Sequence, residues 1–290
     1  MELRRYRADD LAPLTELHNA ALAHEHEFVP YTEKKLDEEL QTSRSIWLAI
    51  EHDRIVGAAF YVPMWYGNEI VSLTEPNLDP TEIEAALLDW VEAEIDGDAA
   101  VIAVPSDQTD RKVFLEARGY ADDGGMIQLV ADLEDERPIP TLPEGYALRS
   151  LHPDERAAFV EMVNAAYDAE RLSPNAFERW AENPGWTEDW IPVVAYRGAL
   201  VAAVVARPDR DYNDHFGANR GYLGPAAVLP AHGKQGLGRA LTAASLNVCR
   251  HQGMDRASLY TTQSNTAVHR LTEQLGFRAT HRWDFLKKEV

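Results

Sequence analysis

Cysteine and long apolar runs are what this 290-residue sequence has least of. Its single cysteine, Cys249, excludes an intramolecular disulfide and a zinc site built from cysteines. No run of about 18 apolar residues is present, which argues against a membrane-spanning helix. The first residues also lack the apolar segment of a secretory signal. We therefore expect a cytoplasmic protein.

Basic residues are scarce in the first half of the chain. Residues 1–140 hold 11 Lys and Arg against 31 Asp and Glu, a net charge of −20, whereas residues 141–290 hold 17 of each kind. An acidic half would repel nucleic acid and anionic lipid, so we expect neither nucleic acid nor a membrane as a partner. The charge is typical of a solubilising surface, and the alternative is a field that attracts a cationic small molecule or a basic partner.

Three prolines mark a change of composition near the middle of the chain. Pro138, Pro140 and Pro143 follow an acidic run, and a stiff polar segment of this kind suits a linker. We place a first domain at residues 1–133, the linker at 134–144 and a second domain at 145–290. Both halves predict the same order of strands and helices, which indicates an internal repeat. The expected fold class is α+β (mixed α/β).

A glycine-rich turn separates an expected strand from an expected helix in the second half. The stretch HGKQGLGR, residues 232–239, supplies three glycines and two cations before the helix. Such a turn binds anions because the first helical N–H groups lack partners and the helix dipole adds positive charge there. The Walker A pattern fails because no Gly-Lys pair is followed by Ser or Thr. The dinucleotide pattern fails because Leu241 falls on its last glycine.

The turn resembles the pyrophosphate loop of the GNAT superfamily of coenzyme A–dependent acetyltransferases, written Q/R-x-x-G-x-G/A. Gly236 and Gly238 match its last two marks, and an expected strand ends before it at Val228. Gly233 occupies the Q/R position, a departure that leaves Lys234 and Arg239 as the candidate sources of positive charge.

A second signature of the superfamily, N-x-x-A-x-x-L-Y-x-x-x-G-F, is similar to residues 265–277. Val268 replaces its alanine. Thr272 replaces a tyrosine that protonates the departing thiolate in many members, and threonine is a far weaker acid. Four marks hold their places: Asn265, Leu271, Gly276 and Phe277. The two signatures and the repeat resemble the tandem members of the superfamily, a subgroup that includes mycothiol synthase.

This resemblance implies two GNAT-like domains in tandem, each a mostly antiparallel twisted central sheet flanked by helices, with acetyl-CoA as co-substrate. We expect a bulge at Gly224-Pro225, because both residues weaken a regular ladder. The strand after it would hold the pantetheine arm and the loop would hold the pyrophosphate. The implied cofactor-binding residues are Ala226, Ala227, Val228, Gly233, Lys234, Gln235, Gly236, Leu237, Gly238, Arg239 and Asn265.

Two tyrosines are candidates for the catalytic role that Thr272 cannot fill. Tyr222 lies on the expected strand before the bulge, and Tyr260 lies on the following strand. For each, a purely structural place in the sheet is the alternative. No base is assigned, and direct attack with water carrying the protons is compatible with the superfamily. No metal-ligand spacing is visible, so we expect no metal.

The first half lacks the glycine-rich turn. At the corresponding place acidic residues surround the helix start, and they would repel a pyrophosphate: Glu75, Asp79, Glu82 and Glu84. We therefore expect residues 1–133 to be a degenerate GNAT-like copy that does not bind coenzyme A through its phosphates.

The sequence thus predicts an enzyme, a GNAT-type N-acetyltransferase that moves an acetyl group from acetyl-CoA to a small-molecule amine by direct attack in its second domain. The acceptor stays open: a cationic small molecule is one hypothesis, and protein lysines or N-termini are another. The alternative class is an acyl-CoA-binding sensor or pseudoenzyme, because Gly233 and Thr272 each remove a familiar functional side chain. We expect a monomer or a homodimer.

Overall fold

The computed structural model describes residues 1–64, 66–95, 99–181 and 186–290, whose contacts form two compact units. Unit 1 comprises Met1–Ile127, Thr262–Ser264 and His281–Val290, and unit 2 comprises Gln128–Thr261 and Asn265–Thr280. The sequence-based division put every residue from 145 onward in the second domain, whereas contacts place the last ten residues in unit 1. The strands β6 (Ala121–Asp132) and β12 (Arg278–Glu289) therefore contribute to both units.

Unit 1 contains a mostly antiparallel sheet. The strands β1 (Glu2–Arg5), β2 (Arg44–Glu51), β3 (Arg54–Met64) and β4 (Gly67–Thr74) pair in sequence order and antiparallel. The next strand, β5 (Ala99–Pro105), is parallel to β4. Residues 283–289 of β12 then pair antiparallel with the whole of β5, which explains why the end of the chain belongs to this unit.

Helices cover both faces of this sheet. They are η1 (Ala8–Asp10), α1 (Leu11–Leu22), α2 (Glu33–Thr42), α3 (Pro80–Glu92) and α4 (Thr109–Ala117). Successive side chains of a strand point to opposite faces, so Ala58 and Ala59 belong to different hydrophobic clusters. Ala59 packs in a cluster with α3, and Ala58 packs in one with α1 and α2. The helix residues of the two clusters are Ile83, Leu87, Leu88 and Val91, and Leu14, Leu17, Leu36 and Leu40.

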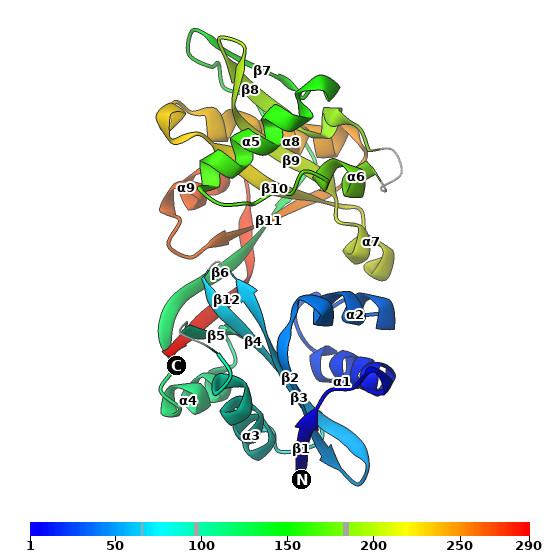
Figure 1. Cartoon of the computed structure of the whole chain (residues 1–290). Helices are drawn as coiled ribbons and strands as arrows, with labels where there is room; N and C mark the ends of the chain where they lie inside the picture. Colours follow the sequence, from blue (N-terminus) through cyan, green and yellow to red (C-terminus); the bar gives the residue numbers. More distant parts are fainter. Residues whose placement is uncertain (65, 96–98, 182–185) are drawn as a thin grey trace. The chain divides into compact units, whose positions relative to one another are not determined.

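Unit 2 has the same plan (Figure 1). The strands β7 (Tyr146–Ser150), β8 (Pro192–Tyr196), β9 (Ala199–Pro208) and β10 (Arg220–Val228) pair antiparallel in sequence order, and β11 (Arg256–Thr262) is parallel to β10. The connecting elements are η2 (Pro153–Glu155), α5 (Arg156–Tyr167), α6 (Ala176–Ala181), η3 (Glu188–Trp190), α7 (Arg210–Phe216), η4 (Pro230–His232), α8 (Leu237–His251) and α9 (Thr266–Gln274).

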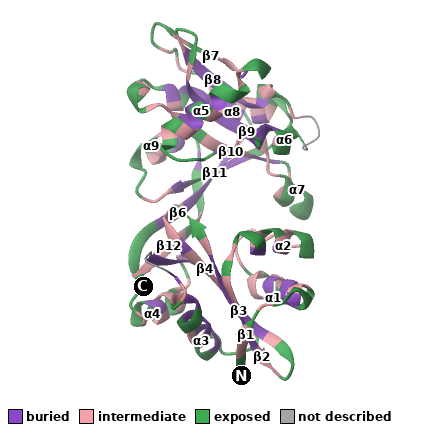
Figure 2. Ribbon diagram, viewed as in Figure 1, coloured by how far each residue is buried: buried purple, intermediate pink, exposed green. Residues whose placement is uncertain are grey.

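The core of unit 2 lies between its strands and α5. Phe159, Met162 and Val163 of α5 pack on Ala203 and Val205 of β9. The helix α8 also contacts β8, β9 and β10. Figure 2 shows long buried stretches on these strands, in contrast to the exposed helix α7. The mixed α/β class and the mostly antiparallel sheets flanked by helices are confirmed. Among the described residues, no helix has both the length and the apolarity to cross a bilayer.

The segment predicted as a linker, residues 134–144, contains no helix or strand and is held to the rest of unit 2 by hydrogen bonds. The backbone N–H of Arg137 donates to Asn247 Oδ1 on α8, and Asn247 Nδ2 donates back to the Arg137 carbonyl. The guanidinium of Arg137 also donates to the carbonyls of Asp132 and Leu275. Backbone polar groups of this segment thus find fixed partners, so the segment lies against unit 2 along a defined path.

Gly221 sits on β10 where α8 leaves no room for a side chain. A Cβ built there would lie 2.6 Å from Cys249 Sγ and 2.8 Å from Met254 Sδ. We expect Gly221→Ala to lower the free energy of unfolding by about 1–3 kcal/mol, because overpacking forces neighbouring groups to move. Urea unfolding measures this. The double variant Gly221→Ala/Cys249→Ala should recover part of the loss, and purely additive effects would contradict the proposed clash.

Candidate active site

A cavity of about 250 Å³ opens in unit 2 beside the end of the parallel strand pair. It is lined by residues of β9, β10, β11, α8 and α9, by the last residue of α5 and by the segment that follows α5. The cavity brings together both candidate tyrosines and part of the implied cofactor set: Tyr222, Tyr260, Ala226, Ala227, Val228, Gly238 and Asn265. The two sequence signatures, separated by β11 in the chain, therefore meet at one place.

A bulge in β10 creates the opening. The pairing of β9 with β10 shifts register between Leu223 and Ala226, and the intervening Gly224-Pro225 peptide bond is cis. The parallel pairing of β10 with β11 covers residues 220–222, upstream of the bulge. Beyond it the backbone of residues 226–228 lines the cavity, as the sequence led us to expect. The Ala226 carbonyl accepts a hydrogen bond of 2.8 Å from the Tyr167 hydroxyl, which ties this strand to the end of α5.

The glycine-rich loop leads into the N-terminus of α8. Gly236 is the N-cap residue with φ 78°, a left-handed conformation that glycine adopts at little cost, and Lys234 has φ 60°. No acidic residue lies in the first turn of α8. The Gly233 N–H already donates to the Pro230 carbonyl at 3.1 Å, so an anion would rely on the N–H groups that follow it. A Cβ at Gly238 would stand 3.3 Å from Leu271 Cδ1, which keeps this position small.

The residues of the second signature have clear structural roles. The Asn265 side chain caps α9 by accepting from the Val268 N–H at 3.2 Å, and Asn265 also lines the cavity. The Thr272 hydroxyl donates within its own helix, where it lies 2.8 Å from the Val268 carbonyl and 3.0 Å from the His269 carbonyl. A threonine bonded in this way cannot replace the tyrosine of the signature as a proton donor.

Tyr222 lines the cavity together with Arg171, and Arg207 lies over its ring. The guanidinium carbon of Arg207 is 4.8 Å from the centroid of the Tyr222 ring, and these residues stand opposite each other in the register of β9 and β10. Burial raises the pKa of the Tyr222 hydroxyl above its usual value, and the charges of Arg207 and Arg171 partly offset that rise. The hydroxyl therefore keeps its proton at neutral pH.

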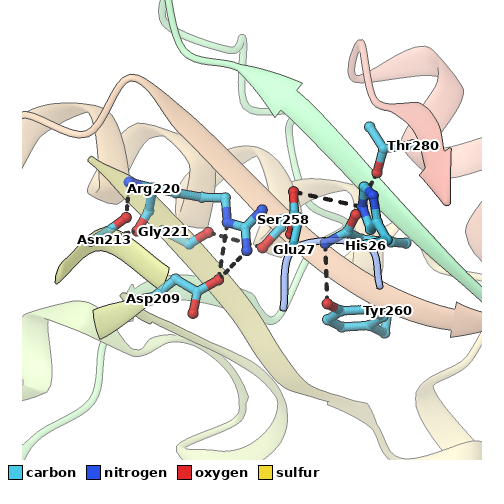
Figure 3. Close-up of polar contacts among 10 residues, drawn as sticks. His26, Glu27, Asp209, Asn213, Arg220, Gly221, Ser258, Tyr260 and Thr280 are labelled. Carbon is cyan, nitrogen blue, oxygen red and sulfur yellow. Dashed lines mark hydrogen bonds and ion pairs between the residues drawn. The ribbon is translucent and has the colours of Figure 1, made fainter. Parts of the chain in front are cut away.

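Tyr260 belongs to a hydrogen-bonded chain within unit 2 (Figure 3). Its hydroxyl accepts from Gln128 Nε2 at 3.1 Å, and Gln128 Oε1 accepts from the Thr280 hydroxyl at 2.6 Å. Gln128 is fully buried, while Tyr260 is 40% exposed. The network fixes the ring of Tyr260 beside the cavity, and its centroid lies 6.1 Å from that of Tyr222.

A buried arginine, Arg220, holds the connection between β9 and β10 that contains α7 (Figure 3). Arg220 Nε and Nη2 donate to Asp209 Oδ2 at 3.0 and 2.7 Å, and the guanidinium lies over the Tyr212 ring. The Arg220 N–H and carbonyl also bond the Asn213 side chain. Asp209 is therefore engaged in structure, and it does not belong to the described lining of the cavity.

The corresponding region of unit 1 is built differently. The helix α3 begins with Pro80, and its N-cap Asp79 accepts from the Thr81 N–H. Glu84 is buried and accepts hydrogen bonds from Ser72 and Arg111. A cavity of about 700 Å³ adjoins these groups. The helix N-terminus that would face a phosphate is thus capped by one carboxylate and followed by others.

Sequence comparison identifies the family of the second half. Residues 148–277 match the acetyltransferase (GNAT) family. This part of the chain is a GNAT acetyltransferase domain. The mycothiol acetyltransferase of Salinispora arenicola is 33% identical over 175 residues, which cover 55% of this chain and 53% of the relative. That of Kocuria rhizophila is 26% identical over 253 residues, 80% of each protein. The chain spans about half the length of the first relatives that it matches.

Solved structures extend the likeness to the whole fold. A GCN5-related N-acetyltransferase from Sphaerobacter thermophilus superposes with a TM-score of 0.75 at 16% identity, over 99% of this chain and 95% of that one. A tandem GNAT protein from the clavulanic acid biosynthesis pathway gives a TM-score of 0.69 at 18% identity, over 99% and 98%. At these identities the likeness concerns the fold, and it confirms the predicted tandem GNAT architecture.

The geometry of the loop predicts which substitutions abolish cofactor binding. Gly238→Val would drive side-chain atoms into Leu271, and Gly236→Val would place a branched residue at φ 78°. We expect either change to abolish acetyl-CoA binding measured by calorimetry, and Lys234→Ala/Arg239→Ala to weaken it. Gly253→Val is the matched control, because Gly253 also has a positive φ but lies after the far end of α8. Unchanged affinity in the Gly236 and Gly238 variants would contradict this assignment of the loop.

Proposed function

We propose that unit 2 transfers the acetyl group of acetyl-CoA to the nitrogen of a small-molecule amine. The observation that carries this proposal is the convergence of three features on one cavity: an uncapped, acid-free helix N-terminus, a strand that leaves its neighbour, and a protonated tyrosine. Backbone N–H groups of residues 234–239 would hold the pyrophosphate, and residues 226–228 with Asn265 would hold the pantetheine arm.

The chemical step follows from these positions. The neutral amine nitrogen attacks the thioester carbonyl carbon, a C–N bond forms, and the C–S bond breaks. The thiolate that leaves takes the proton of the Tyr222 hydroxyl, and the proton of the new ammonium passes to water, from which the tyrosinate recovers one. Arg207 and Arg171 stabilise the transient negative charge on Tyr222. The described lining of the cavity contains no Asp, Glu or His, which supports direct attack without a carboxylate or imidazole base.

The second candidate function is an acyl-CoA sensor without transferase activity. The hydroxyl of Thr272 supports it, because that group is committed to helix carbonyls. Tyr222 favours the transferase, because it supplies at the same cavity the proton donor that Thr272 cannot be.

Small amines of several kinds are candidate acceptors. The curated relatives are named for mycothiol, so the amine whose acetylation gives mycothiol belongs in any acceptor panel beside other small amines. Cytoplasmic location and a monomeric or homodimeric state stay predictions.

Removal of the Tyr222 hydroxyl tests the mechanism. We expect Tyr222→Phe to lower kcat about a hundredfold or more, with little change in acetyl-CoA affinity. A general acid usually contributes a rate factor of about this size. In the unmodified protein, the loss of activity at high pH that reports Tyr222 should lie above the usual titration range of a phenol, since burial raises the pKa of this hydroxyl. Tyr212→Phe is the control, because Tyr212 lies outside the described lining. Tight acetyl-CoA binding without turnover of any amine would favour the sensor.

Cofactor stoichiometry tests the assignment of the two units. We expect one acetyl-CoA per chain, because Asp79 and Pro80 occupy the helix start of α3 that would have to bind phosphate in unit 1. Calorimetric titration measures the number. Two equivalents per chain, with one of them retained in Gly238→Val, would contradict the proposal that residues 1–133 are a degenerate copy.

A further inference from the structure

Two arginine side chains lie at or beside the cavity of unit 2, although the net charge of the chain is −20. Arg171 lines the cavity. The described lining of the cavity includes no carboxylate. Arg207 flanks Tyr222 on the same side of the sheet, because residues directly opposite in an antiparallel pair share a face. The charges of both arginines act on the Tyr222 hydroxyl. One guanidinium group thus lines the cavity, and a second lies beside the lining residue Tyr222.

Neither guanidinium is neutralised by a carboxylate among the described residues. Arg171 lies 5.6 Å from the centroid of the Tyr167 ring, and Arg207 lies 4.8 Å from that of Tyr222. An aromatic face attracts a cation but leaves its charge and most of its N–H groups available. The nearby carboxylate of Asp209 is already paired with Arg220 at 2.7 Å.

The position of Arg207 separates it from the proposed pyrophosphate site. The glycine-rich loop follows Val228, which lies six residues beyond Tyr222 along β10. At about 3.3 Å per residue, the distance between Tyr222 and Val228 is at most about 20 Å. Arg171 also acts on Tyr222, and the neighbouring Tyr167 bonds the Ala226 carbonyl just after the bulge. Both arginines thus lie near Tyr222, away from the proposed pyrophosphate site.

We propose that the acceptor amine carries an anionic group, a carboxylate or a phosphate, which Arg171 and Arg207 bind. This inference rests on the proposed transferase function and replaces the hypothesis of a cationic acceptor. Arginine suits both groups, because its planar fork of N–H donors matches carboxylate and phosphate oxygens. A purely cationic amine would instead meet two like charges and no carboxylate partner.

Matched acceptor pairs test this proposal in the full chain. The probes are phosphoethanolamine against ethanolamine and γ-aminobutyrate against butylamine, with kcat/KM followed through release of the coenzyme A thiol. We expect about a tenfold or larger preference for the anionic member of at least one pair, the effect of one or two charge-assisted hydrogen bonds. Preference in the first pair alone would identify phosphate, and in the second alone carboxylate.

Substitution of the arginines shows whether they cause the preference. Arg171→Gln and Arg207→Gln should each lower the ratio of the two kcat/KM values several-fold, and Arg→Lys at the same sites should retain part of it. The ratio cancels any effect on Tyr222, because both members of a pair use the same proton donor. Arg197→Gln should leave the ratio unchanged, since Arg197 also lies over a tyrosine ring, but that ring belongs to Tyr196, which does not line the cavity as Tyr222 does.

The outcomes separate this inference from the proposed function. Equal turnover within both pairs, or a preference that survives both Gln variants, would overturn the inference and leave the transferase intact. Failure to acetylate any amine would overturn the transferase. In that case calorimetry on coenzyme A–saturated protein decides, with phosphoethanolamine and γ-aminobutyrate as ligands. Binding of either ligand that is lost in the Gln variants would uphold the anion site, and no binding would overturn it.

Discussion

The break in the ladder of β10 at Gly224-Pro225 is the constraint on which the site depends. Upstream of it, Tyr222 is paired on both sides, with β9 and with β11. Downstream, β10 keeps its pairing with β9, and residues 226–228 line the cavity. In a regular strand, the N–H and C=O groups of these residues would form hydrogen bonds with the neighbouring strand. The bulge thus produces the cavity, its exposed backbone and the position of Tyr222 together.

Charge in this protein is a local property. The net charge of −20 belongs to the first half, whereas the proposed site would use helix N–H groups and arginines in a half with equal numbers of acidic and basic residues. Solvent-exposed charges are screened over about 10 Å, so the composition of a whole half says little about a cavity. The contrast between α3 and α8 shows the same point. Both helices follow a strand that is paired with a parallel neighbour. The N-terminus of α3 is capped by Asp79, whereas α8 has Gly236 at its N-cap and no side-chain cap.

The local conformations around the candidate site could be predicted from the sequence. The positive φ of Gly236, the bulge at Gly224-Pro225 and the N-cap formed by Asn265 each follow from the type of residue present. Tyr167 and Arg171 were missed, because they lie at the end of α5 and just after it and reach the cavity only through tertiary packing. The pairing of residues 283–289 with β5 was also missed, because the sequence of a strand does not specify which strand it pairs with. Arg137 shows the same limit, because its partners on α8 lie 110 residues away in the chain.

A crystal structure with acetyl-CoA tests the central claim most directly. The account predicts one cofactor per chain, with its pyrophosphate at the N-terminus of α8, its pantetheine arm along residues 226–228 and its sulfur within hydrogen-bond reach of the Tyr222 hydroxyl. Pyrophosphate bound away from residues 234–239, or a thioester remote from Tyr222, would contradict the assignment of this cavity as the active site.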